Sequence, residues 1–215
     1  MSELKVVLAD GSQRPLNDFF WPHLLLMLAS LLLCLSVFLP FWSIKMNAPQ
    51  FPDGLKAVLY IDRVEGHVQE IDGLNHYLGM PPLDEGGKLE RKVSLGAVGL
   101  MSLLILGTLF VHNRWAGAMG VPALVFPWVF LADLQLILYR YGHSVDPESA
   151  LGGAIKPFTP PVIGVGKIGQ FITEASFGAG FYLSLAAAGC VLAGLWMHRR
   201  IYREVALARR RAGVP

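Results

Sequence analysis

The residues best suited to chemistry are two histidines and two methionines within one polar stretch, residues 44–92. His67, His76 and Met80 lie in this stretch, and Met46 lies near its start. His76 and Met80 are four positions apart, which would place them on one face of a helical turn. Imidazole and thioether ligands together suit copper, especially Cu(I), better than magnesium or calcium. The pattern indicates a Cu(I) site; the alternative is structural, with His76 hydrogen-bonded in the loop and Met80 packed beneath it.

A second candidate is Asp133, which lies inside a long apolar stretch. An ionisable side chain in such a stretch usually faces a partner, a cavity or water. Arg140 follows seven residues later on about the same helical face, so we expect a structural acid that pairs with Arg140 or with polar groups such as Gln135. The alternative is a proton or ion pathway.

Small residues recur every four positions in the last apolar stretch, at Ser176, Gly180, Ser184 and Ala188. Such a stripe lets another helix approach closely. It predicts a helix-packing surface, used either within the chain or with another protein.

Motifs for catalysis are absent from the sequence, which contains no GxSxG, HExxH or Walker motif. The segment GVGKIG spaces Gly164, Gly166 and Gly169 like a dinucleotide-binding fingerprint. That fingerprint requires a preceding strand and a following helix in a βαβ unit. Here it follows a proline-rich stretch and precedes an apolar one, so we expect backbone turns instead. The sequence predicts no catalytic residue and favours a protein that is not an enzyme.

The elements that must position these residues are long apolar segments. Of 215 residues, 53% are hydrophobic and only 16% are charged, whereas a soluble domain carries about a quarter charged residues. Crossing a bilayer takes about 20 apolar residues. The sequence predicts an all-α membrane protein of two helical hairpins, with four transmembrane helices in the segments 19–43, 93–111, 115–139 and 175–197, the middle two joined by residues 112–114.

Charges in the connecting segments set the expected orientation. Residues 1–18 and 198–215 form tails, and the second carries the basic run RRIYREVALARRR. Because cytoplasmic segments are enriched in lysine and arginine, we expect both termini in the cytoplasm of a bacterium. The protein would then be a multi-pass protein of the inner membrane, with loops 44–92 and 140–174 in the periplasm. A net charge of +2 gives no dominating basic field, so nucleic acid is not an expected partner.

Both outer loops have patterns of ordered structure and are expected to form a small extracytoplasmic cap. The apolar residues Leu55, Ala57, Leu59 and Ile61 alternate with Lys56, Val58, Tyr60 and Asp62, which is typical of a half-buried strand. The stretch IKPFTPPVIG (155–164) is rich in proline, which predicts extended backbone.

Three phrases in these loops carry a family resemblance: NAPQFPDGL (47–55), VEGHVQEIDGLNHYLGM (64–80) and IKPFTPPVIGVGKIGQF (155–171). They resemble a group of small four-helix bacterial membrane proteins associated with copper-dependent respiration and nitrous oxide reductase maturation. The resemblance implies an accessory or maturation protein for a periplasm-facing copper- or haem-dependent respiratory enzyme, handling Cu(I) through His67, His76 and Met80.

Two other classes of function remain open. The first is a non-catalytic structural subunit of a larger membrane complex, which docks on other membrane or periplasmic subunits through its outer loops and last helix. The second is a small transporter that uses Asp133.

Overall fold

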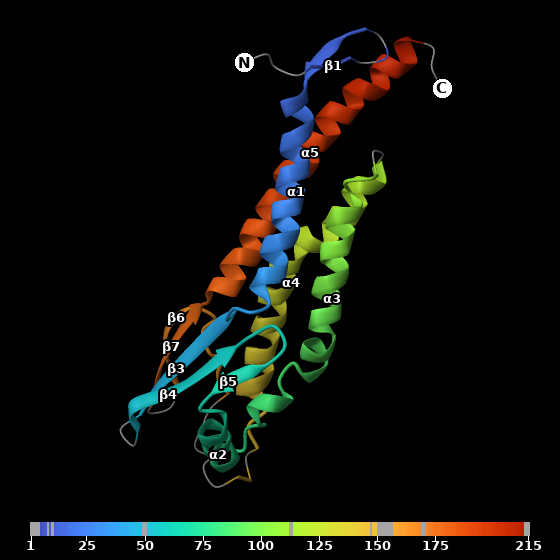
Figure 1. Ribbon diagram of the computed structural model, residues 1–215. Helices are drawn as coiled ribbons and strands as arrows, with labels where there is room; N and C mark the ends of the chain where they lie inside the picture. The colour runs from blue at the N-terminus through green and yellow to red at the C-terminus, as the bar shows by residue number, and fades with distance from the viewer. Residues whose placement is uncertain are drawn as a thin grey trace. The chain divides into compact units, whose positions relative to one another are not determined.

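The computed structural model describes residues 5–7, 9, 11–48, 51–111, 114–146, 148–149, 157–168 and 171–212. In these residues the protein is mixed α/β, with five α-helices, one short 3-10 helix and seven strands in two sheets (Figure 1). The helices are α1 (Leu16–Ser36), α2 (Val68–Leu78), η1 (Leu83–Glu85), α3 (Lys88–Gly107), α4 (Arg114–His143) and α5 (Ala179–Arg211). The strands are β1 (Lys5–Val7), β2 (Gln13–Pro15), β3 (Trp42–Ala48), β4 (Phe51–Leu59), β5 (Val64–Gly66), β6 (Gly164–Ile168) and β7 (Phe171–Phe177).

The prediction of an all-α protein is therefore wrong. The segments expected to be outer loops supply a sheet: β3, β4 and β5 come from the first, and β6 and β7 from the second. Strand β3 also takes residues 42–43, which were expected to end the first transmembrane helix. Strand β7 also takes residues 175–177, which were expected to begin the last transmembrane helix. Residues 172–175 of β7 alternate between exposed and buried, as expected for a strand, because successive side chains of a strand point to opposite faces.

The prediction of four membrane-spanning helices is also wrong. Among the described residues, three helices are long and apolar enough to cross a membrane: Leu16–Ser36, Trp115–His143 and Ala179–Arg209. The helix expected over 93–111 is α3, which begins earlier, with charged residues in its first turns, and ends at Gly107. Beyond that point the hydroxyl of Thr108 donates to the carbonyl of Ile105 at 2.6 Å, and Phe110 N–H donates to Gly107 O at 3.1 Å, so tight turns replace the helix.

Two compact units make up the chain, and each is described by itself. The helical unit comprises residues 1–34, 99–126 and 184–215. The sheet unit comprises residues 35–98 and 127–183. Helices α1, α3, α4 and α5 contribute residues to both units.

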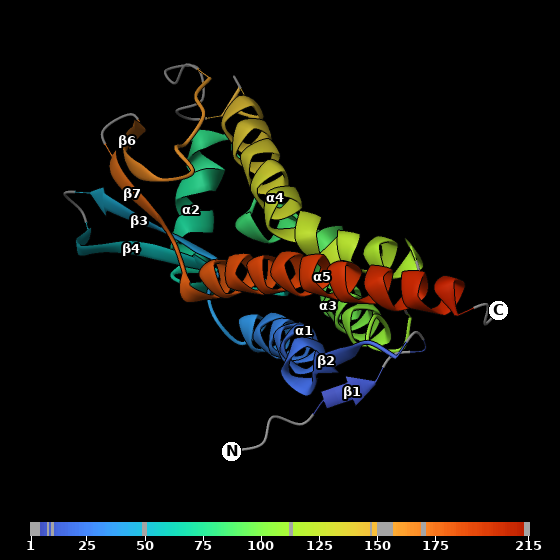
Figure 2. The ribbon, with the colours of Figure 1, turned by 90° about the horizontal axis from the view of Figure 1, so that it is seen from above.

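The sheet unit is built on a five-stranded antiparallel sheet of order β5-β4-β3-β7-β6 (Figures 1 and 2). In the central strand β3, Ile44 pairs with Ala57 of β4 and with Ala175 of β7, and all three are buried. The next row, at Lys45, Lys56 and Glu174, is exposed. One face of the sheet is therefore apolar and the other is polar. The strand predicted from the alternation around Leu55 and Ala57 is confirmed as β4.

Aromatic packing fixes the start of α5 in the same unit. Phe41 is fully buried and its ring centroid lies 5.0 Å from that of Phe130. Phe181 lies 5.8 Å from Phe130 and stacks on Phe177 at 4.4 Å. This cluster joins β7, α4 and the segment before β3.

The helical unit packs through small residues. A Cβ atom at Gly194 of α5 would lie 3.0 Å from Cγ of Leu26 on α1, so glycine lets the two helices approach closely. Ser102 of α3 accepts the Cys34 Sγ–H at 3.3 Å through its hydroxyl. Leu26, Ile105 and Val191 are fully buried between these helices.

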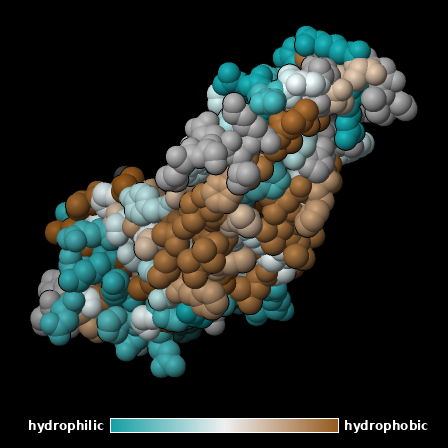
Figure 3. Space-filling view, turned by 45° about the horizontal axis from the view of Figure 1, so that its top comes forward, coloured by the Kyte–Doolittle hydropathy of each residue, from teal (hydrophilic) through white to brown (hydrophobic). Residues whose placement is uncertain are grey.

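Large apolar side chains stay exposed along the helices. Leu103 is 67% exposed, Trp128 62% and Leu192 62%. Figure 3 shows a broad hydrophobic surface on the face that it presents. Exposed apolar surface on this scale marks contact with lipid or protein, and the three long apolar helices are compatible with a membrane protein.

Candidate functional site

An apolar cavity of about 140 Å³ lies in the sheet unit, between the apolar face of the sheet and the helices packed on it. Nearly all of its lining is hydrocarbon. The residues that line it are Trp42, Ile44, Met46, Ala57, Leu59, Val64, Ile71, Leu74, Asn75, Met80, Leu83, Gly86, Arg91, Leu134, Ile137, Leu138, Tyr141, Phe158 and Pro160.

The sheet wall of the cavity follows from the two-residue period of β3 and β4. Trp42, Ile44 and Met46 alternate along β3, and Ala57 and Leu59 do so along β4. The indole N–H of Trp42 donates to the carbonyl of Val162 at 2.6 Å. This bond satisfies the buried indole and leaves its ring facing hydrocarbon.

The helix wall comes from α2 and the second half of α4. Leu134, Ile137, Leu138 and Tyr141 repeat at the three- and four-residue spacing of one helical face. On α2, Ile71 is only 2% exposed. The α4 residues also belong to the candidate membrane span Trp115–His143, so a segment apolar enough for lipid forms part of this wall.

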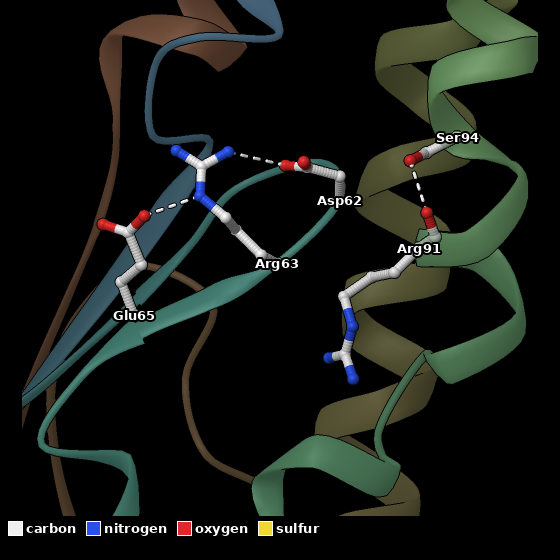
Figure 4. Close-up of polar contacts among 5 residues, drawn as sticks. All are labelled: Asp62, Arg63, Glu65, Arg91 and Ser94. Carbon is white, nitrogen blue, oxygen red and sulfur yellow. Dashed lines mark hydrogen bonds and ion pairs between the residues drawn. The ribbon is translucent and has the colours of Figure 1, made fainter.

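The polar groups of the cavity lining have partners. The Asn75 amide donates to the hydroxyl of Tyr141. The Arg91 guanidinium donates to the carbonyl of Gly86 at 2.7 Å, and the carbonyl of Arg91 accepts from Ser94 Oγ at 2.8 Å (Figure 4). Buried polar groups with partners are stable in place, so these contacts shape the wall and leave the cavity apolar.

A charged cluster lies in the turn between β4 and β5 of the same unit. Arg63 Nε donates to Glu65 at 2.6 Å and Nη1 donates to Asp62 at 2.9 Å (Figure 4). The bond to Glu65, with the negative charges of Asp62 and Glu65, raises the pKa of Arg63 although burial opposes it. Its guanidinium carbon also lies 4.1 Å from the Tyr60 ring centroid. The cluster is exposed, and its effect is to hold this turn.

The four residues expected to bind copper fall into two groups. Met46 and Met80 both line the cavity. His67 and His76 are exposed, and Nδ1 of His67 accepts from the Lys56 N–H at 3.2 Å. The described residues contain no group of three or more His, Cys, Asp and Glu that could hold a metal ion. The structure therefore brings the two thioethers to the cavity, and neither imidazole lines it. The Cu(I) site stays a prediction.

The end of α2 explains why His76 and Met80 separate. Gly79 is left-handed, with φ +68°, and its N–H donates to the His76 carbonyl at 3.3 Å. The Met80 N–H then donates back to Asn75 O at 2.8 Å. This cap ends the helix and carries Met80 under the sheet, where it is 8% exposed.

Asp133 lies on α4 and is half-buried. Glu90 and Arg140 are the charged groups that act on it. In the described part of the chain no ion pair joins it to Arg140 or to any other cation. The paired acid and the ion pathway therefore both stay predictions.

The stripe of small residues is split between two elements. Ser176 lies in β7, whereas Gly180, Ser184 and Ala188 lie on α5. Ser184 is fully buried, and a Cβ atom at Gly180 would lie 2.6 Å from the carbonyl oxygen of Leu39. Of the fingerprint glycines, Gly164 and Gly166 lie in β6, which pairs antiparallel with β7, and Gly169 lies outside the described residues.

No protein-family model and no curated protein matches this chain. The geometry of the cavity is therefore the observation from which function is argued. Its lining includes no carboxylate, histidine or cysteine among the described residues. Such a lining, which is almost entirely hydrocarbon, suits the binding of an apolar group.

Sequence reasoning missed most of this cavity. The alternation in WSIKMNA (42–48) was a readable strand signal, but Trp42 was assigned to the end of the first helix. The helical spacing of Leu134, Leu138 and Tyr141 was also visible, though nothing in it indicated which element it would face.

Proposed function

We propose that this chain is a membrane-anchored accessory protein whose sheet unit binds an apolar chain, such as the acyl or isoprenoid chain of a membrane lipid. The observation that carries the proposal is the apolar cavity, which the sheet and α2 and α4 line with almost no polar surface. The polar groups in the lining are held by Gly86 and by the Asn75–Tyr141 pair. A ligand with a polar centre would find few partners there.

The energetics favour a flexible hydrocarbon. Each methylene transferred from water into such a cavity contributes about 0.8 kcal/mol, which corresponds to about a fourfold gain in affinity. Helix α4 supplies both cavity residues and a candidate membrane span. Lipid hydrocarbon would therefore be the most abundant apolar ligand near the cavity.

The setting of this activity belongs to the proposal as well. The basic end of α5 favours the cytoplasm, so we infer an inner-membrane protein with the sheet unit in the periplasm. The resemblance of its loops to proteins of copper-dependent respiration supports an accessory or maturation role beside a respiratory enzyme. Copper handling at the cavity would use the thioethers of Met46 and Met80, since they alone of the four candidates line it.

Photo-crosslinking tests the proposal directly. The full chain in lipid nanodiscs is exposed to a fatty alcohol with a diazirine in its chain, and the labelled peptides are mapped by mass spectrometry. We expect saturable labelling of β3, α2 and Met80, abolished by excess unlabelled alcohol. Ala57→Leu, which fills the cavity from β4, should remove it, and Val58→Leu, on the opposite face of the same strand, should not.

A folding measurement guards against simple misfolding. Ala57→Leu should still unfold cooperatively in detergent, with a thermal midpoint close to that of the unmodified chain, while it loses the labelling. Labelling of the cavity peptides that does not saturate, or that Ala57→Leu leaves unchanged, would refute the proposal. The docking-subunit interpretation would then replace it.

A further inference from the structure

A basic groove lies on the C-terminal part of α5, within the helical unit. It has a volume of about 600 Å³ and is lined by Trp196, Arg199, Arg200, Arg203, Glu204 and Leu207. These positions repeat at intervals of three and four, so they occupy one face of the helix. None of them took part in the cavity of the sheet unit.

The groove carries a net positive charge. Its one acid, Glu204, forms an ion pair with Arg14 at the N-terminal hairpin. Arg199, Arg200 and Arg203 are exposed, and no ion pair is found for them among the described residues. Three guanidinium groups therefore face the groove with no carboxylate of their own.

One edge of the groove is apolar. Trp196 is 65% exposed and Leu207 is 40% exposed. The guanidinium of Arg200 lies 5.8 Å from the Trp196 ring centroid, within cation–π range. Trp196 also marks the point in α5 where the apolar sequence gives way to arginines. Tryptophan is enriched at the interface between hydrocarbon and head groups.

We propose that this groove binds the phosphate head group of an anionic phospholipid. Guanidinium groups donate paired hydrogen bonds to phosphate oxygens, and the phosphodiester of an anionic phospholipid offers such oxygens together with a net negative charge. Trp196 and Leu207 would lie along the glycerol and upper acyl chains. That apolar edge is the reason to assign a lipid to the site instead of free phosphate.

Native mass spectrometry of the full chain in detergent tests this assignment. The probes are short-chain phosphatidylglycerol, short-chain phosphatidylcholine and inorganic phosphate. We expect phosphatidylglycerol to bind at least tenfold more tightly than phosphatidylcholine. Because a basic residue near an anionic lipid contributes about a fivefold gain, the triple variant Arg199→Gln/Arg200→Gln/Arg203→Gln should lose about a hundredfold in affinity.

The matched control is Arg209→Gln/Arg211→Gln, which removes two arginines of the same helix outside the groove. It should retain at least half of the binding, and circular dichroism should show that both variants keep their helix content. Equal binding of the two lipids, or an unchanged triple variant, would overturn the proposal. So would an equal loss in the control, or inorganic phosphate displacing the lipid at an equal concentration.

Discussion

Asn75 and Tyr141 form the polar contact that joins α2 to α4 across the cavity wall. Asn75 is only 6% exposed, and its amide donates to the tyrosine hydroxyl. In an apolar wall an amide without its acceptor bears the full cost of desolvation, about 1–3 kcal/mol. The Tyr141 hydroxyl therefore helps to hold α2 against α4 and so to shape the cavity.

Tyr141→Phe should lower the stability of the protein by about 1–3 kcal/mol, because it leaves the buried Asn75 amide without this acceptor. The measurement is the thermal unfolding midpoint in detergent. Tyr139→Phe is the matched control, since Tyr139 lies on the same helix and is 50% exposed; it should leave the midpoint unchanged. Equal midpoints for the two variants would show that the contact contributes nothing.

Copper binding gives a second prediction at this scale. Because His76 is exposed and Met80 is buried at the cavity, His76→Ala should leave the Cu(I) affinity of the full chain unchanged. Competition with a chromogenic Cu(I) chelator measures it. The contrary result is that His76→Ala and Met80→Leu both lower the affinity for one Cu(I) ion while Tyr77→Phe leaves it unchanged. In that case the site predicted from the sequence exists, and the end of α2 must rearrange to form it.

Among the elements, local pattern predicted some and failed for others. The alternation around Leu55 and Ala57 identified β4 correctly. Strand β7 alternates as clearly, with Thr173 and Ala175 buried and Glu174 exposed. It runs directly into the apolar sequence of α5, however, and was divided between the second outer loop (to residue 174) and the last helix (from residue 175). Apolar residues beside a membrane segment do not show where one element ends and the next begins.

Close approach at the start of α5 yields a prediction for this element. Gly180→Ala should destabilise the protein, because its Cβ atom would lie 2.6 Å from Leu39 O and 2.8 Å from the Phe41 ring. Gly189→Ala on the same helix meets no atom within 4 Å and should raise stability by up to about 1 kcal/mol through helix propensity. The measurement is the thermal unfolding midpoint of both variants. An unchanged midpoint for Gly180→Ala would show that the segment before β3 can move to accommodate the methyl group.

At the scale of the whole molecule, the cavity arises where segments distant in sequence meet. Its walls include Trp42, Met80, Tyr141 and Phe158, which belong to four separate stretches of the chain. Composition predicted an apolar, membrane-compatible chain, and the alternation and proline-rich stretch in the loops predicted their ordered character. It could not predict that both loops enter one sheet, because strand pairing across such separations leaves no local periodicity.

The orientation in the membrane supplies the prediction for the whole molecule. After replacement of Cys34 and Cys190 by alanine, Lys45→Cys on the polar face of the sheet should react with an impermeant maleimide in intact spheroplasts. Arg203→Cys should react only after lysis, because the basic end of α5 is expected in the cytoplasm. Reaction of both before lysis would exclude the proposed topology.

The pairing of β3 with β7 also means that β3 is synthesised well before its partner strand. Ser43 and Ser176 face each other in the finished sheet although 133 residues separate them. At about 5–20 residues per second, the ribosome needs about 7–27 s to make that stretch. During this time β3 has one open edge, to which a strand of another nascent chain could add. In the hairpin of β3 and β4, Lys45 lies opposite Lys56, so the positive charges of two such hairpins repel each other. Strand β7 instead places Glu174 opposite Lys45, and the opposite charges favour its addition.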